Sequence, residues 1–246
     1  MDVIRPDWPA PATVRGAVTR RAGGVSTGPY ASFNLASHVG DAPAAVAANR
    51  ARLRVALGLP REPVWLRQVH GTAIVDAALA PPEAQADASF ATVPGHCCVV
   101  LTADCLPILL CDAAGTRVAA VHAGWRGLAA GIVAATVIRL GTPPGELLAW
   151  IGPGIGPRAY AVGPELRATF CAADAACAAA FRQDGGQWYA DLAAIARRQL
   201  DALGVGWIGG SAECTFEAAD RCYSYRREPV TGRMASLVWL VPGDTR

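Results

Sequence analysis

The sequence predicts an α/β fold, and three observations support that prediction. Apolar runs of strand length, rich in β-branched residues, recur along the chain. Stretches whose apolar residues repeat with helical spacing lie between them. Hydrophobic residues make up 52% of the 246 residues and charged residues 17%. Such a composition buries a sizeable core, in one domain or in two closely joined halves.

The first expected helix follows a strand and a loop that is dense in turn-forming residues. Asp41 is its expected N-cap, because a short acidic side chain accepts hydrogen bonds from the free N–H groups of a first turn. Pro43 suits that first turn. Val46 and Leu53 belong to an apolar stripe that ends before Gly58. A helix is therefore expected between Asp41 and Gly58.

The other elements follow from the same patterns, and no internal repeat divides the chain. Runs of β-branched residues or leucine predict strands, and helical periodicity predicts helices. In chain order, the expected strands are 14–19, 64–69, 72–75, 99–102, 108–111, 117–121, 147–151 and 237–241, and the further helices are 127–140, 164–171 and 191–203.

Three residues with metal-binding side chains stand at the ends of expected strands. His70 and His122 each lie close to a glycine, and Cys105 follows Asp104 after the strand at 99–102. Two imidazoles and one thiolate match a catalytic zinc site, in which three protein ligands leave the fourth tetrahedral position open. The three residues are dispersed in the sequence, so buried core residues at strand tips explain the same pattern.

Two other chemistries fit the same residues. In a metal-free thiol hydrolase, Cys105 is the nucleophile, His122 its base, and Asp104 or another polar group orients the base. In a copper oxidoreductase, two histidines and one cysteine form the equatorial ligand set, with Met1 or Met234 as the axial ligand. Four histidines in the whole chain are too few for the several coppers of a true laccase.

Composition and charge exclude several classes of protein. The net charge of +2 is too small for a groove that binds a nucleic acid polymer. The N-terminus lacks a leader pattern, and no apolar run is long enough to span a membrane. We therefore expect a soluble, cytoplasmic protein that keeps its eight cysteines reduced and needs no protein partner to fold.

Three arginines are candidates for binding an anionic substrate, because a guanidinium presents a planar fork of donors. Arg21 precedes a Gly-Gly turn, and Arg126 lies just behind His122. Arg226 follows two tyrosines and could stack on a base while pairing with phosphate. An ordinary surface position is the alternative for each.

Short motifs distributed over nearly the whole chain make the sequence resemble the YfiH-like, laccase-domain family of purine nucleoside phosphorylases, whose members were first named polyphenol oxidases. The motifs most specific to that family are TADCLP and HAGWRGL. The full set is RAGGVS at 21–26, SFNL at 32–35, GD at 40–41, NR at 49–50, QVHG at 68–71, TADCLP at 102–107, HAGWRGL at 122–128, IGP at 151–153 and SYRR at 224–227.

The resemblance implies a fold and an activity. It implies one α/β domain over residues 1–246, with mixed β-sheets flanked by helices, similar to the catalytic domain of cytotoxic necrotizing factors. It implies phosphorolysis of adenosine, inosine, guanosine and S-methyl-5′-thioadenosine, with adenosine deamination at the same site. A role in peptidoglycan precursor editing, by amide or ester hydrolysis, has also been linked to bacterial relatives.

The resemblance also implies site residues. The zinc ligands of the family fall on His70, Cys105 and His122, the trio that the chemistry of the residues suggests, although copper stays open. The candidate substrate-binding residues are Arg21, Asn34, Gln68, Arg126 and Arg226. Whether Asn34, Gln68 and Arg226 face the pocket or support its wall stays open.

Overall fold

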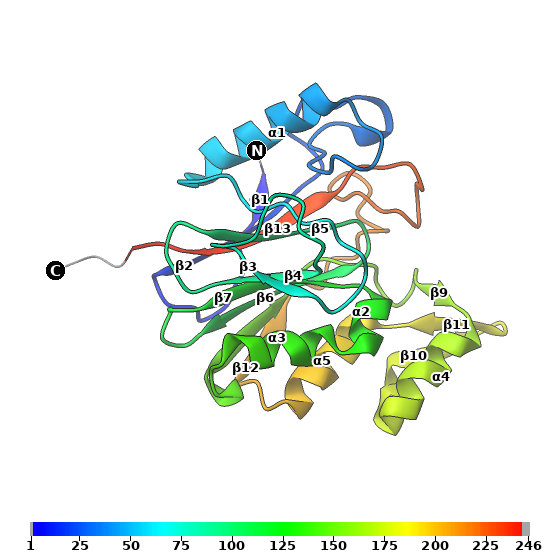
Figure 1. Ribbon diagram of the computed structural model, residues 1–246. Coiled ribbons are helices and arrows are strands. Elements are labelled where there is room, and N and C mark those ends of the chain that lie inside the picture. The colour runs from blue at the N-terminus through cyan, green and yellow to red at the C-terminus, as the bar shows by residue number, and fades with distance from the viewer. Residues whose placement is uncertain (1, 243–246) are drawn as a thin grey trace.

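The computed structural model describes residues 2–242 and shows a mixed α/β arrangement with three β-sheets (Figure 1). The largest sheet has six strands in the order β12-β8-β6-β7-β4-β3. Only its two outermost pairs, β12 with β8 and β3 with β4, are parallel. The strands are β3 (Ile74–Asp76), β4 (Ala88–Ala91), β6 (Leu106–Asp112), β7 (Val118–Ala123), β8 (Leu147–Ile151) and β12 (Trp207–Gly210).

A second sheet lies against one face of the six-stranded sheet (Figure 1). Its order is β1-β2-β13-β5. Along β13, Leu237 faces outward to a core shared with Leu53 of the first helix, whereas Val238 faces the six-stranded sheet and packs in one cluster with Leu109. This alternation is the period of two that a strand buried on both faces requires. The strands are β1 (Val3–Ile4), β2 (Val14–Thr19), β5 (Cys97–Thr102) and β13 (Met234–Leu240).

Helices cover both outer faces of this pair of sheets (Figure 1). Helix α1 (Pro43–Leu57) lies on the outside of the second sheet. Helices α2 (Trp125–Ala130), α3 (Ile132–Leu140) and α5 (Leu192–Ala202) lie below the six-stranded sheet in Figure 1. Leu140 and Ile195 bury their side chains against that sheet in the largest apolar cluster. The layer order is therefore helix, sheet, sheet, helices.

A smaller third sheet, of order β10-β11-β9, extends from this body beside helix α4. Short 3-10 helices occur at η1 (Gly28–Tyr30), η2 (Pro144–Glu146) and η3 (Ala175–Ala180). No helix within residues 2–242 combines the length and apolar character needed to cross a membrane. The remaining elements are β9 (Ala161–Val162), α4 (Pro164–Ala173), β10 (Phe181–Asp184) and β11 (Gln187–Ala190).

Most of the expected elements are confirmed, and three expectations are wrong. The N-cap of α1 is Ala42, because the Asp41 carboxylate accepts hydrogen bonds from Ser26 and Asn34 instead. The expected helix 127–140 is two helices, because Gly131 takes a left-handed conformation (φ 89°) between them. The expected strand 64–69 is a loop with one bridging residue.

Candidate metal centre

The three candidate ligands converge at the ends of neighbouring segments. In the register of β6 and β7, Leu106 lies opposite Ala123, which brings Cys105 and His122 together at one end of the pair. His70 reaches the same point from the loop before β3. The ligand atoms of His70, Cys105 and His122 all lie within 4.8 Å of one another. Residues that are dispersed in the sequence therefore form one cluster, as expected.

A buried carboxylate holds two of these ligands in place. Asp87 is fully buried, and its Oδ1 lies 2.8 Å from His122 Nδ1. The carboxylate also accepts the backbone N–H groups of Val69 (3.2 Å), His70 (2.9 Å) and Gly71 (2.7 Å). These three bonds hold His70 in a left-handed conformation, φ 59°, that a non-glycine residue seldom adopts without such support.

The donor set fits a metal ion of borderline softness such as zinc. Because Asp87 engages Nδ1 of His122, the other ring nitrogen, Nε2, is the one available to a metal, which is the usual carboxylate-histidine-metal arrangement. Gly124 leaves room for the cluster. A Cβ at this position would lie only 3.0 Å from Cys105 Sγ and 3.3 Å from a His70 ring carbon, so any side chain would crowd the ligands. The group can therefore bind a metal ion.

The charge state of the cluster favours a thiolate. Burial raises the pKa of Cys105, but hydrogen bonds and positive charge from His122 and His70 outweigh burial and lower that pKa to about 6. Burial lowers the pKa of His122, but its hydrogen bonds with Asp87 and Cys105 outweigh burial and raise that pKa to about 9. A thiolate beside an imidazolium is the form expected near neutral pH without metal.

This charge state predicts how metal-free protein reacts with iodoacetamide. Labelling of Cys105 should level off above about pH 7, because the thiolate is then fully formed, and slow about tenfold per pH unit below its pKa of about 6. Cys111, whose pKa burial raises to about 12, should stay unlabelled at pH 7. Mass spectrometry of chelator-treated protein across pH 5–9 measures both; a Cys105 rate that still climbs between pH 8 and 9 contradicts the prediction.

The cluster opens into a cavity of about 420 Å³. Its wall contains the predicted residues Arg126 and Arg226. It also contains Tyr160 and Arg233, which were not predicted from the sequence. The full lining is His38, Gln68, His70, Leu101, Thr102, Ala103, Asp104, Cys105, His122, Trp125, Arg126, Ile155, Tyr160, Tyr225, Arg226 and Arg233.

Asp104 lies in the cavity wall, but its carboxylate has other partners than His122. One oxygen accepts a hydrogen bond from the Thr215 hydroxyl (2.7 Å), and the other accepts the backbone N–H of Arg226 (2.7 Å). The carboxylate that orients His122 is that of Asp87. Asp104 instead anchors the segment that carries Arg226 to the cavity.

Two predicted substrate-binding residues lie outside the cavity lining. Arg21 donates to the backbone oxygens of Ala31 and Ala219, and its guanidinium lies over the Tyr223 ring. Asn34 is fully buried, and its Oδ1 accepts the backbone N–H of Arg233 at 3.0 Å. Both residues brace the loops around the cavity.

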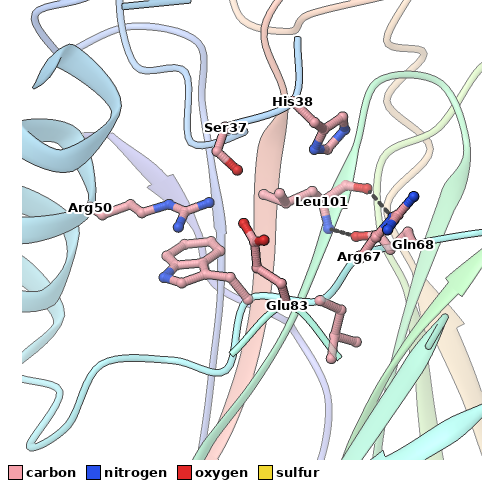
Figure 2. A pocket seen from close by; sticks show the side chains of 9 residues that line it. Ser37, His38, Arg50, Arg67, Gln68, Glu83 and Leu101 are labelled. Atoms are coloured by element: carbon pink, nitrogen blue, oxygen red, sulfur yellow. Dashed lines mark hydrogen bonds between the residues drawn. The ribbon is translucent and has the colours of Figure 1, made fainter. Parts of the chain in front are cut away.

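Gln68 contributes its side chain to the wall between two cavities. Its amide donates to Leu101 O (2.8 Å) and accepts from Leu101 N (2.7 Å), as Figure 2 shows by dashed lines. Both ends of the amide are thus used by the backbone. The second cavity, of about 330 Å³, shares His38, Gln68 and Leu101 with the first and is floored by Trp65, over which Arg50 stacks at 4.1 Å.

Residues 15–241 match the family model described as "Multi-copper polyphenol oxidoreductase laccase". The chain belongs to this family. Among solved structures, this laccase-family chain is similar to a Neisseria meningitidis protein, with a TM-score of 0.95 and 46% identity over 98% of this chain and 100% of that one. It is also similar to YlmD from Geobacillus stearothermophilus, with a TM-score of 0.85 and 30% identity over 96% of each chain.

Curated relatives of this laccase-family chain carry a different enzyme name. A Pseudomonas aeruginosa protein named purine nucleoside phosphorylase is 53% identical over 96% of this chain and 98% of its own length. The Escherichia coli protein named purine nucleoside phosphorylase YfiH is 49% identical over 97% of this chain and 99% of its own length. The resemblance stated from the sequence is thus confirmed.

Proposed function

We propose that this chain is a zinc-dependent purine nucleoside phosphorylase that also deaminates adenosine. Its proposed substrates are inorganic phosphate and adenosine, inosine, guanosine or S-methyl-5′-thioadenosine. The observation that carries the proposal is the cluster of His70, Cys105 and His122 at the floor of an open cavity, in a chain about half identical to proteins with that enzyme name.

A zinc ion would be held by His70, Cys105 and His122 and would supply a Lewis acid. The chain's own residues supply orientation and hydrogen bonds. Asp87 fixes His122, and burial together with the charge on Cys105 raises the pKa of Tyr160 to about 12. The Tyr160 hydroxyl therefore stays protonated and can donate a hydrogen bond to the departing purine. In phosphorolysis a phosphate oxygen bonds to the ribose C1′ while the C1′–N bond breaks and its electrons leave with the base.

The proposal is tested by incubating purified, zinc-analysed protein with adenosine, with and without inorganic phosphate. We expect adenine and ribose 1-phosphate to form only when phosphate is present, and inosine to form without it. Chromatography separates all four compounds. The same incubation is repeated with inosine, guanosine and S-methyl-5′-thioadenosine. If protein carrying one equivalent of zinc converts none of the four nucleosides, the proposal is contradicted.

A specific observation also supports a second candidate, a cysteine hydrolase that edits peptidoglycan precursors. The structure offers a nucleophile in Cys105 and a base in His122, which are hydrogen-bonded to each other. The orienting carboxylate is that of Asp87, whose oxygen lies 2.8 Å from His122 Nδ1. The proposed likeness to the catalytic domain of cytotoxic necrotizing factors agrees with this candidate. Hydrolysis of a muropeptide precursor by metal-free protein, without phosphate, distinguishes it from the phosphorylase.

Copper oxidation, which the family's description names, has less support from the residues. Within residues 2–242, the His70, Cys105 and His122 group is the one cluster suited to a metal. Met234 is buried with Ala103 and Tyr223 and does not line the cavity; Met1 lies outside the described residues. A single copper at this cluster is tested by measuring catechol oxidation by copper-loaded protein.

A further inference from the structure

Two arginines that line the cavity leave the same donor edge, Nε and Nη2, without an acceptor among residues 2–242. We propose that Arg233, together with Arg226, binds the phosphate group used by the reaction, and that Arg21 and Arg126 do not. The proposal rests on the proposed function in one respect: it takes the phosphate to be the inorganic co-substrate. The way in which each guanidinium is held distinguishes the four arginines.

Arg233 is anchored on one side of its guanidinium. It precedes β13, and because Met234 lies opposite Thr102 in that sheet, Arg233 stands at the edge where β5 ends and the segment to Cys105 begins. Its Nη1 donates to Thr231 O and to Gly232 O, both at 2.9 Å. Both Nη1 hydrogens are thus used. The Nε and Nη2 groups have no acceptor among residues 2–242.

Arg226 is also anchored through Nη1, although by one acceptor only and on an exposed side chain. Its Nη1 donates to Ala161 O at 2.9 Å, its guanidinium lies 5.0 Å from the centre of the Tyr160 ring, and its backbone N–H is bound by Asp104. Again Nε and Nη2 have no acceptor in the described part of the chain. Two preorganised guanidinium groups thus keep the same edge free in one cavity, which lowers the entropy cost of binding a ligand there.

The free edge is the one that this protein uses elsewhere for bidentate binding of oxyanions. Arg158 binds the two oxygens of Glu217 through Nε (3.1 Å) and Nη2 (2.9 Å). Arg198 binds both oxygens of Asp174 through the same two nitrogens. At Arg233 and Arg226 no carboxylate of residues 2–242 takes this place, so the edge is free to bind a ligand with paired oxygens.

The charge of the cavity selects an anion. Arg126, Arg226 and Arg233 all line it, and none forms an ion pair with a carboxylate of residues 2–242. The one carboxylate in the lining, Asp104, is already bound by Thr215 and the backbone of Arg226. Burial lowers the pKa of Arg233, so an anion beside it relieves a desolvation penalty.

Arg126 and Arg21 lack this construction. Arg126 is exposed and lies 4.6 Å from the Trp125 ring centre, but no acceptor in the described residues fixes its guanidinium. Arg21 donates its hydrogen bonds to backbone oxygens outside the cavity. Arg226 and Arg233 are therefore better suited than Arg126 or Arg21 to hold a phosphate ion in a fixed orientation toward the ribose carbon.

The proposal is tested with Arg233→Gln, Arg233→Lys and Arg226→Gln in the zinc-loaded protein. Calorimetric titration with inorganic phosphate is expected to show a Kd raised about tenfold to a hundredfold in each glutamine variant, since each loses charged hydrogen bonds. The KM for phosphate should rise by a similar factor. Arg233→Lys keeps the charge but loses the fork, so its Kd should also rise.

Arg182→Gln is the matched control, because Arg182 is an exposed arginine of β10 that lines neither cavity. Circular dichroism and zinc content confirm that each variant is folded and loaded. If the Arg182 variant weakens phosphate binding as much as Arg233→Gln, or if folded Arg233 and Arg226 variants both keep the wild-type Kd and KM, the proposal is overturned.

Two further outcomes separate this proposal from the proposed function. If phosphate binds through Arg233 but no nucleoside is phosphorolysed, the phosphate site stands and the phosphorylase function falls. If the Arg233 variants lose binding of adenosine 5′-monophosphate but keep that of inorganic phosphate, the fork holds the phosphate of a nucleotide substrate, and the proposal as stated is overturned.

Discussion

Cys105→Ala is expected to remove both the bound metal and the activity. The thiolate is the one anionic ligand in the cluster, and two neutral imidazoles alone hold zinc weakly. We expect zinc to fall from about one equivalent to near zero, and phosphorolysis to fall at least about a thousandfold. Elemental analysis and a ribose 1-phosphate assay on protein purified without added metal measure the two effects.

Cys171→Ala provides the control for this experiment, since Cys171 is a partly exposed cysteine of α4 outside both cavities. It should keep both zinc and activity. Zinc retained by the Cys105 variant contradicts the assigned ligand set. Zinc lost with phosphorolysis intact contradicts the zinc dependence of the proposed reaction.

Asp87→Asn is expected to weaken metal binding and to destabilise the fold. An asparagine in the same place keeps one acceptor oxygen but turns an NH₂ group toward N–H donors, so at least one of the four contacts of Asp87 is lost in a buried site. We expect zinc affinity to fall about tenfold to a hundredfold. The free energy of unfolding should fall by about 2–4 kcal/mol.

Asp112→Asn separates the two effects of the Asp87 variant. Asp112 is also a buried aspartate that accepts backbone N–H groups, those of Thr116 and Arg117, but it lies at the far end of β6. Its variant should lose stability while keeping zinc affinity. Competition with a chromogenic chelator measures the zinc affinity of each variant, and urea unfolding measures its stability. Equal zinc affinities in the two variants contradict a positioning role for Asp87.

The fold was predictable where local pattern and burial agree. The strand at 14–19 and helix α1 have the expected bounds because their apolar residues face a core at the period of their own element. Strand β4 was missed because its sequence, ASFA, is short and mostly small. Its conformation is set by pairing with β7, a distant segment. The hairpin of β10 and β11 was missed because each strand has only four residues and β10 is mostly exposed and polar.

The metal-binding cluster was predictable because histidine and cysteine are recognisable as ligands from their residue type alone. Histidine and cysteine at strand ends pointed to the cluster without knowledge of the fold. Asp87 carries no such signal, because an aspartate between two alanines looks like any loop acid until β4 brings it against His122. Arg233 resembles a surface arginine for the same reason. Partners chosen by tertiary packing cannot be read from local sequence.

The uneven burial of the three ligands has a kinetic consequence. His122 is almost fully buried and Cys105 is partly buried, whereas His70 is exposed on a loop that Asp87 holds through backbone bonds. Opening that loop frees one ligand while the other two stay in place. Exchange of the ion with solvent or with a metal donor should therefore proceed through the His70 side, at a rate governed by how often the loop detaches from Asp87.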